Sequence, residues 1–257
     1  MITPRPLLSM QTWEKEPMTY FSYEEKIFFK QNGYIVKPNT VTLELIEPAL
    51  EVIGQHIDAD RYQAESWIKA GPKGNLPCTN HSDIKALLEK SHQISMAEEL
   101  AGQGSLKVAN YPFCKMIYPT GETDWQLPDR GHMDGYTHPG RVDTFTLGIT
   151  LNLNDIQHRG GGFTVWPGTH ITVAEYFKTH SLLDGPQAYG DQLPQPVEIF
   201  GPSGTTCFWH HYLMHNASKN CQTEIRMATV SRLGWKNTED IKFETPDNIW
   251  EYWEGLK

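Results

Sequence analysis

The segment from Gly131 to Gly135 carries the pair of side chains best suited to chemistry, His132 and Asp134, two positions apart. On an extended backbone, side chains at i and i+2 point to the same face, so an imidazole and a carboxylate converge there. A nitrogen donor and an oxygen donor that meet at one point suit a first-row divalent metal. One more ligand would complete a facial set of three, so the hypothesis depends on a third donor elsewhere in the chain.

The third donor is sought among the 11 histidines. Five lie in predicted helices or loops and are assigned structural or surface roles: His56, His81, His92, His158 and His180. His215 differs, because it ends a cluster that follows a strand-like run and precedes a turn. Arg226, at the start of another strand pattern, can hold a ligand carboxylate through two parallel hydrogen bonds. A lone His-x-Asp motif or a lone arginine arises easily by chance, whereas this ordered combination does not.

A glycine-rich segment, residues 159–170, lies between these groups and ends in a Pro-Gly-Thr-His turn. With this segment, the His-x-Asp motif, His215 and Arg226, the sequence resembles the phytanoyl-CoA dioxygenase-like group of iron(II)- and 2-oxoglutarate-dependent oxygenases. The resemblance covers residues 111–232, and the first hundred residues match only in their helical character. The Pro-Gly-Thr-His turn looks like the family's structural turn, so His170 is not expected to be a ligand.

The resemblance implies a double-stranded β-helix in which Fe(II) is held by His132, Asp134 and His215. It also implies that Arg226 binds the far carboxylate of the cosubstrate 2-oxoglutarate. Arg232, on the same face of the strand by parity, is the alternative for that role. Further cosubstrate contacts fall, by position in the family's pattern, to Thr150, Lys115 or Tyr118.

Three protein ligands on one face of an octahedral iron leave three positions for bidentate 2-oxoglutarate and O₂. The expected reaction is hydroxylation of a C–H bond of a small molecule, with release of succinate and CO₂. Desaturation and ring formation remain open, whereas halogenation is disfavoured because related halogenases replace the Asp134 carboxylate with a small residue. Arg130, His138 and Arg141 could hold an anionic substrate or be ordinary loop charges.

Two other hypotheses remain. One is a metal-dependent, cupin-like enzyme that does not use 2-oxoglutarate, and Arg226 argues against it because the arginine would have no carboxylate to hold. The other is a non-catalytic jelly roll that binds a small ligand. The complete set of His132, Asp134 and His215 argues against that second hypothesis, since a decayed site need not keep all three ligands.

The elements that would position these residues change along the chain from helices to short strands. Ser22 and Glu25 form a capping box, which predicts a helix that ends near Gly33 and a strand at residues 34–36. Helical periodicity recurs at residues 42–61, 82–90 and 92–100. Strands are predicted at residues 106–119, 144–154, 163–166, 196–200, 205–209 and 224–233, and further helices at residues 173–180 and 248–254.

Helices followed by short strands favour a sandwich or jelly roll with helices packed on one side. Together with the resemblance, this predicts a mainly β fold with flanking helices (α+β). Its core would be a double-stranded β-helix of the jelly-roll, cupin-like type, with the N-terminal helices packed on one sheet. We expect a single domain over residues 1–257, with a helix-rich part at 1–105, the β-helix at 106–235 and a tail with a short helix at 236–257.

The composition narrows the classes of partner. A formal charge of −9 over 257 residues argues against nucleic acid or an anionic membrane as the main partner. The four cysteines are scattered and form no C-x-x-C pair, so neither a cysteine zinc site nor a disulfide framework is indicated. No stretch resembles a secretory signal or a membrane span, so we expect a cytoplasmic protein that acts on a small molecule.

Overall fold

The first helix begins and ends where its capping residues require. In the computed structural model, which describes residues 19–60, 63–68, 75–135, 140–184 and 193–257, helix α1 spans Tyr23–Asn32. The Ser22 hydroxyl accepts a hydrogen bond from the Glu25 backbone, and the Glu25 carboxylate accepts one from the Ser22 backbone at 2.8 Å. Gly33 follows with a φ of 79°, and a Cβ there would lie 2.5 Å from Nδ1 of His170. The predicted capping box and helix are confirmed.

The next part of the chain is mostly helical. Its elements are β1 (Tyr34–Lys37), α2 (Leu43–Gly54), η1 (Ala64–Trp67), α3 (Ser82–Glu89) and α4 (Gln93–Ala101). The helices predicted at residues 82–90 and 92–100 are confirmed, whereas α2 ends at Gly54, well short of residue 61. Glycine is a poor helix former, and Asp58 and Asp60 beyond it favour turns over helix. No helix among the described residues is long and apolar enough to cross a membrane.

Two antiparallel sheets follow. Besides β1, these sheets contain β2 (Leu106–Ile117), β3 (Leu147–Asn152), β4 (Phe163–Val165), β5 (Val197–Ile199), β6 (Thr206–His210), β7 (His215–Ala217) and β8 (Arg226–Trp235). The larger sheet has the order β1-β6-β3-β8-β2, and the smaller has the order β5-β4-β7. Every described pair of neighbouring strands runs antiparallel. Antiparallel sheets with separate helices make this an α+β fold, as predicted.

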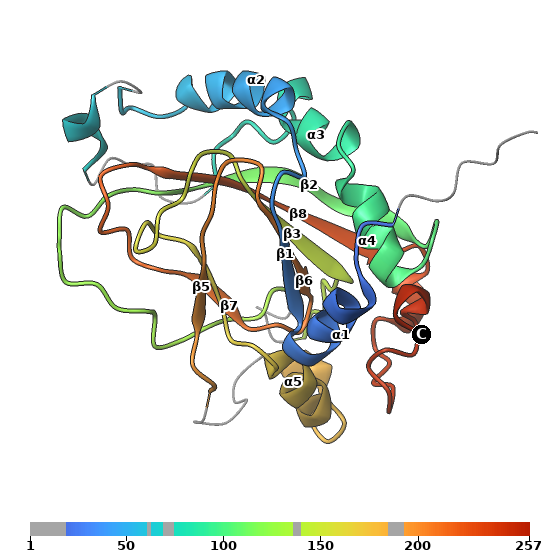
Figure 1. Ribbon diagram of the computed structural model, residues 1–257. Coiled ribbons are helices and arrows are strands. Elements are labelled where there is room, and N and C mark those ends of the chain that lie inside the picture. The colour runs from blue at the N-terminus through green and yellow to red at the C-terminus, as the bar shows by residue number, and fades with distance from the viewer. Residues whose placement is uncertain (1–18, 61–62, 69–74, 136–139, 185–192) are drawn as a thin grey trace, which may run out of the picture.

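The three middle strands of the large sheet, β6, β3 and β8, are buried on both faces. Figure 1 shows α2, α3 and α4 along one side of the sheet, with β5 and β7 on the other side. On β3, Leu147 and Ile149 join a core cluster with α1 and α4, and Leu151 joins a second cluster with α2 and α3. The alternate side chain Thr150 is only 2% exposed, because that face points toward the smaller sheet. Alternation at residues 144–154 therefore marks two buried environments.

The last elements correct part of the prediction. They are α5 (Thr169–Phe177), η2 (Leu182–Asp184), α6 (Thr238–Ile241) and η3 (Glu254–Leu256). The α-helix predicted at residues 248–254 is wrong, since turns occupy that stretch up to the start of η3 at Glu254. Trp250 and Trp253 pack against Phe29 of α1, with ring centroids 5.9 and 5.6 Å away. This tertiary packing of two large indoles outweighs a weak helical pattern.

Three histidines lie together where α1, α5 and β6 meet, with His170 and His210 buried and His211 half-buried. The His170 ring donates from Nε2 to the Lys30 carbonyl at 3.0 Å, and His210 accepts at Nδ1 from the Tyr212 backbone at 3.1 Å. The His210 ring lies 5.4 Å from that of His170 and 4.4 Å from that of His211. Burial lowers the pKa of His170 to about 4 and that of His211 to about 3. Burial also lowers the pKa of His210 well below its ordinary value.

The free energy of unfolding should therefore fall as the pH is lowered from 6.5 toward 4. In that range the unfolded chain protonates these histidines while the folded protein keeps them neutral. Because the pKa of His170 is about 4 in the folded protein, this residue alone should lower the free energy of unfolding by about 2 kcal/mol between pH 7.5 and pH 5. Urea unfolding of the chelator-treated protein at both pH values measures this loss. His170→Gln should reduce it, whereas His56→Gln, at an exposed position, should not; equal stability at both pH values would contradict the assignment.

Candidate metal centre

Backbone pairing brings the two histidines together. His132 and His215 form an isolated antiparallel bridge, in which each N–H donates to the carbonyl of the other at 2.9 Å. Residues directly opposite in such a pair project to the same face, and the two rings lie 4.5 Å apart. Asp134, two positions after His132, points to the same place. One donor atom from each of the three side chains lies within 4.8 Å of the other two, which is compatible with one metal ion.

Packing orients the His215 ring. Its Nδ1 lies 2.9 Å from the Leu213 carbonyl oxygen, which can only accept, so Nδ1 carries the proton and the lone pair is on Nε2. The ring also packs against Trp209 at 4.4 Å and Phe163 at 5.4 Å. The His215 side chain is 6% exposed, whereas that of His132 is 52% exposed. A metal here would therefore have a buried side and an open side.

Asp134 is surrounded by positive or proton-donating groups. Its Oδ1 lies 3.5 Å from Nε2 of His132, its Oδ2 lies 3.4 Å from Nε2 of His215, and Arg232 donates to the same Oδ2. Burial by itself would raise the pKa of Asp134. The neighbouring side chains of His132, His215 and Arg232 outweigh burial and lower this pKa well below its usual range. Asp134 is therefore anionic at neutral pH.

A cavity of about 450 Å³ adjoins the three residues and contains a buried, unpartnered charge. Arg226 lines it and is only 3% exposed, and among the described residues no group pairs with its guanidinium. Burial lowers the pKa of Arg226 to about 10, and the charge of Glu198 opposes that shift. A buried cation without a hydrogen-bonded partner is costly, so the cavity is suited to an anionic ligand. The two imidazoles and the carboxylate suit a divalent metal. The unpartnered guanidinium suits a carboxylate group on a molecule bound beside that metal.

The other predicted cosubstrate contacts differ in where they lie. Lys115 of β2 lines the cavity, whereas Tyr118 packs against the core cluster that Leu151 forms with α2 and α3. Thr150 does not line the cavity, and its hydroxyl accepts a hydrogen bond from Nε1 of Trp209 at 3.1 Å. Trp209 does line it, so Thr150 reaches the cavity only through that indole. Arg232 also lines the cavity, but its guanidinium is already paired with Asp134.

Gly148 makes room for the Trp209 indole, and the sequence reasoning missed its role. Gly148 lies opposite Trp209 across β3 and β6, and a Cβ on it would lie 2.1 Å from the indole. The indole then packs edge-on against Phe145 at 5.3 Å and beside His215. A glycine inside a strand of β-branched residues often marks a close approach of this kind, so the signal was present in the sequence.

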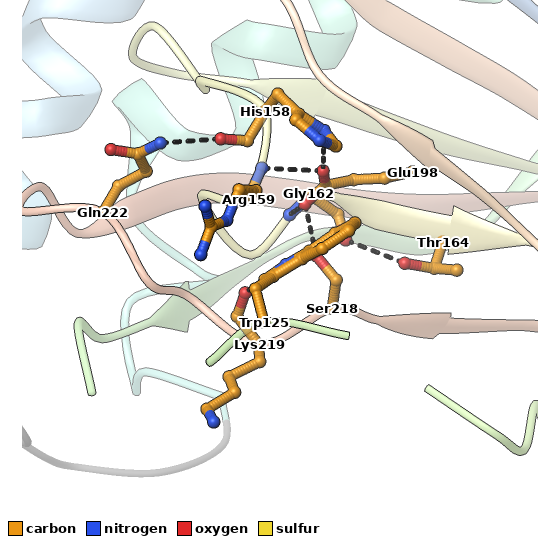
Figure 2. A network of polar contacts seen from close by, with 9 residues as sticks. All are labelled: Trp125, His158, Arg159, Gly162, Thr164, Glu198, Ser218, Lys219 and Gln222. Atoms are coloured by element: carbon orange, nitrogen blue, oxygen red, sulfur yellow. Dashed lines mark hydrogen bonds and ion pairs between the residues drawn. The ribbon is translucent and has the colours of Figure 1, made fainter. Parts of the chain in front are cut away.

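Glu198 of β5 was also missed, and Figure 2 shows the polar network around it. The carboxylate is 2% exposed and accepts from the backbone of Arg159 at 2.8 Å, from the backbone of Gly162 at 3.0 Å and from the Ser218 hydroxyl. The His158 ring lies 2.9 Å from it as a further partner. These contacts tie the glycine-rich turn, β5 and the end of β7 into one unit. A glutamate between two apolar strand residues was the only sequence signal.

Replacing this carboxylate should destabilise the fold. Glu198→Gln leaves at most one oxygen to accept these hydrogen bonds and turns an amide N–H toward a donor. We expect the free energy of unfolding to fall by about 2–4 kcal/mol, measured by urea denaturation. Glu239→Gln, at an exposed position on α6, is the matched control and should change it by less than about 0.5 kcal/mol. Equal small effects of both substitutions would show that the network contributes little.

A second, polar cavity of about 510 Å³ adjoins the first, and Asn110, Asp134 and Arg232 line both. Its charged residues form three ion pairs, namely Asp134 with Arg232, Arg141 with Asp143, and Glu239 with Lys242. Opposite charges therefore balance among its described residues. Of the side chains considered for an anionic substrate, Arg141 is paired here, Arg130 is exposed, and His138 lies outside the described residues.

Comparisons with known proteins place the fold. No protein-family model and no curated protein matches the chain. Similar solved structures include the epimerase SnoN in complex with Fe3+, alpha-ketoglutarate and nogalamycin RO, at 19% identity, a TM-score of 0.57 and 82% coverage of each chain. The non-heme alpha-ketoglutarate-dependent carbocyclase SnoK from nogalamycin biosynthesis has 18% identity and a TM-score of 0.59, over 91% of this chain and 96% of its own.

A third similar structure is HygX from Streptomyces hygroscopicus with nickel and 2-oxoglutarate bound. It has 16% identity and a TM-score of 0.53, over 84% of this chain and 88% of its own. The chain shares its fold with iron- and 2-oxoglutarate-dependent enzymes. At these identities the likeness concerns the fold, so the chemistry has to be argued from this chain's own residues.

Proposed function

We propose that the protein is an Fe(II)- and 2-oxoglutarate-dependent dioxygenase of the phytanoyl-CoA dioxygenase-like group, built on a double-stranded β-helix. One observation carries the proposal. The buried and unpartnered guanidinium of Arg226 lines the same cavity as His132, Asp134 and His215. A metal-dependent cupin-like enzyme without 2-oxoglutarate, or a non-catalytic jelly roll, would have no need for a buried cation at that place. The metal and 2-oxoglutarate in similar structures lend support.

Each residue has a distinct role in this proposal. His132, Asp134 and His215 hold the metal through two nitrogens and one oxygen. Arg226 binds the far carboxylate of 2-oxoglutarate and orients it, and Lys115 adds a second positive charge to the same cavity. Iron and 2-oxoglutarate, when bound, would supply the chemistry of O₂ activation, in which O₂ is the oxidant and 2-oxoglutarate is oxidised to succinate and CO₂. The Phe163 and Trp209 rings exclude water from the buried side.

The proposed substrate is a small polar molecule that binds in the second cavity and places one of its C–H bonds beside the metal. Three ion pairs around that cavity offer both donors and acceptors without a net charge, which favours a neutral or zwitterionic compound over a polyanion or an acyl chain. Hydroxylation is the reaction proposed. Epimerisation and ring closure, the reactions named for SnoN and SnoK, are the second candidates. A compound screen read by succinate release, followed by mass analysis of the product, separates these reactions.

Anaerobic addition of Fe(II) and then 2-oxoglutarate should produce a visible metal-to-ligand charge-transfer band. The band requires both molecules in one site, so His132→Ala should abolish it, whereas His56→Ala, at an exposed position, should preserve it. Absence of the band in the unsubstituted protein, with no 2-oxoglutarate binding by calorimetry, would contradict the proposal.

Arg226→Ala should weaken 2-oxoglutarate binding far more than metal binding. Each charge-assisted hydrogen bond lost is worth about 1.5–3 kcal/mol, so the dissociation constant should rise roughly ten- to a hundredfold per bond. Arg226→Lys keeps the charge without the two-pronged geometry and should give an intermediate value. Calorimetric titration with Mn(II) and then 2-oxoglutarate measures both affinities. Equal loss of both would point to damaged folding and not to a cosubstrate contact.

A further inference from the structure

The Arg232 guanidinium contacts two aromatic rings and one carboxylate. Its central carbon lies 5.3 Å from the ring centre of Phe113 and 5.2 Å from that of Phe145, and Nη2 donates to Oδ2 of Asp134. Cations are attracted to aromatic faces, so the two rings restrict where the guanidinium can lie. Arg232 is thus oriented before any ligand enters.

The same packing also orients His215. Arg232 lies opposite Gly148 on β3, where the absence of a side chain admits the Trp209 indole. That indole contacts Phe145 on one side and His215 on the other. The position of Arg232 is therefore coupled to that of a proposed metal ligand through two aromatic rings.

We infer that Arg232 is a positioning residue, which occupies one oxygen of Asp134 so that the carboxylate binds the metal through the other oxygen alone. The inference rests on the proposed function. Oδ2 accepts the hydrogen bond from Arg232, and Oδ1 remains, 3.5 Å from Nε2 of His132. A carboxylate fixed by a hydrogen-bonding partner keeps its orientation when it ligates a metal.

The coordination count explains why this matters. An octahedral metal has six positions, of which two histidines and one carboxylate oxygen would use three. A bidentate 2-oxo acid and O₂ require the other three. If both oxygens of Asp134 bound the metal, only two positions would be left, which would suffice for the bidentate 2-oxo acid but not for O₂ as well.

The alternative role for Arg232 is direct contact with 2-oxoglutarate, and the metal complex without cosubstrate separates the two roles. Co(II) added to the metal-free protein reports its own coordination number and geometry through its visible ligand-field bands. A residue that touches only 2-oxoglutarate leaves these bands unchanged when it is replaced. A residue that holds Asp134 changes them.

The experiment compares the unsubstituted protein with Arg232→Met, which keeps volume but removes charge and donors, and with Arg232→Lys. Lys107→Met removes an exposed positive charge from the neighbouring strand β2 and is the matched control. We expect Arg232→Met to bind Co(II) as tightly as the unsubstituted protein or more tightly, with altered ligand-field bands. Arg232→Lys should lie between the two, and Lys107→Met should match the unsubstituted protein.

Unchanged Co(II) bands in Arg232→Met would overturn the inference, whatever happens to 2-oxoglutarate binding. Parallel loss of Co(II) binding and of the thermal unfolding transition in both Arg232 variants would also overturn it in favour of a purely structural role. If Arg232→Met alone fails to fold, the bands of Arg232→Lys decide. Failure of the proposed function is distinguishable, because the unsubstituted protein would then bind no Co(II) that depends on His132.

Discussion

The two hydrogen bonds between the backbones of His132 and His215 are the constraint on which the site depends. They join a residue outside the named strands to the first residue of β7, and β7 is itself held by β4, with Val165 opposite His215. Once this pair is formed, strand geometry alone brings both imidazoles to one face. Asp134 joins them by the two-residue period of an extended chain.

Charge balance is the second constraint. Glu198 is buried with a full set of donors, whereas Arg226 is buried with none of the described groups paired to it. The contrast matters because a protein interior penalises an unpartnered charge far more than a satisfied one. The binding of an anion at Arg226 would relieve that penalty, and the metal beside it would hold the other end of the same molecule. Fold and charge thus favour a dicarboxylate in one orientation.

Local patterns sufficed to predict the capped helix at Ser22, the α3 and α4 helices and most strands. The family resemblance was needed to group His132, Asp134 and His215, which the structure brings together. What escaped prediction depends on contacts between distant residues. The strand β7 has three residues, too few for a periodic signal, and the tail at residues 248–254 is shaped by indoles packed on α1. The roles of Gly148 and Glu198 follow from what lies opposite them across the sheets. The pairing of Arg232 with Asp134 likewise needed the three-dimensional structure.

A crystal structure of the protein grown anaerobically with Fe(II) and 2-oxoglutarate would test the central claim most directly, with anomalous scattering measured at the iron edge. The account predicts one strong anomalous peak bound by Nε2 of His132, Nε2 of His215 and a single oxygen of Asp134, with the far carboxylate of 2-oxoglutarate on Arg226. Iron at another place, or 2-oxoglutarate that leaves Arg226 unpaired, would contradict it.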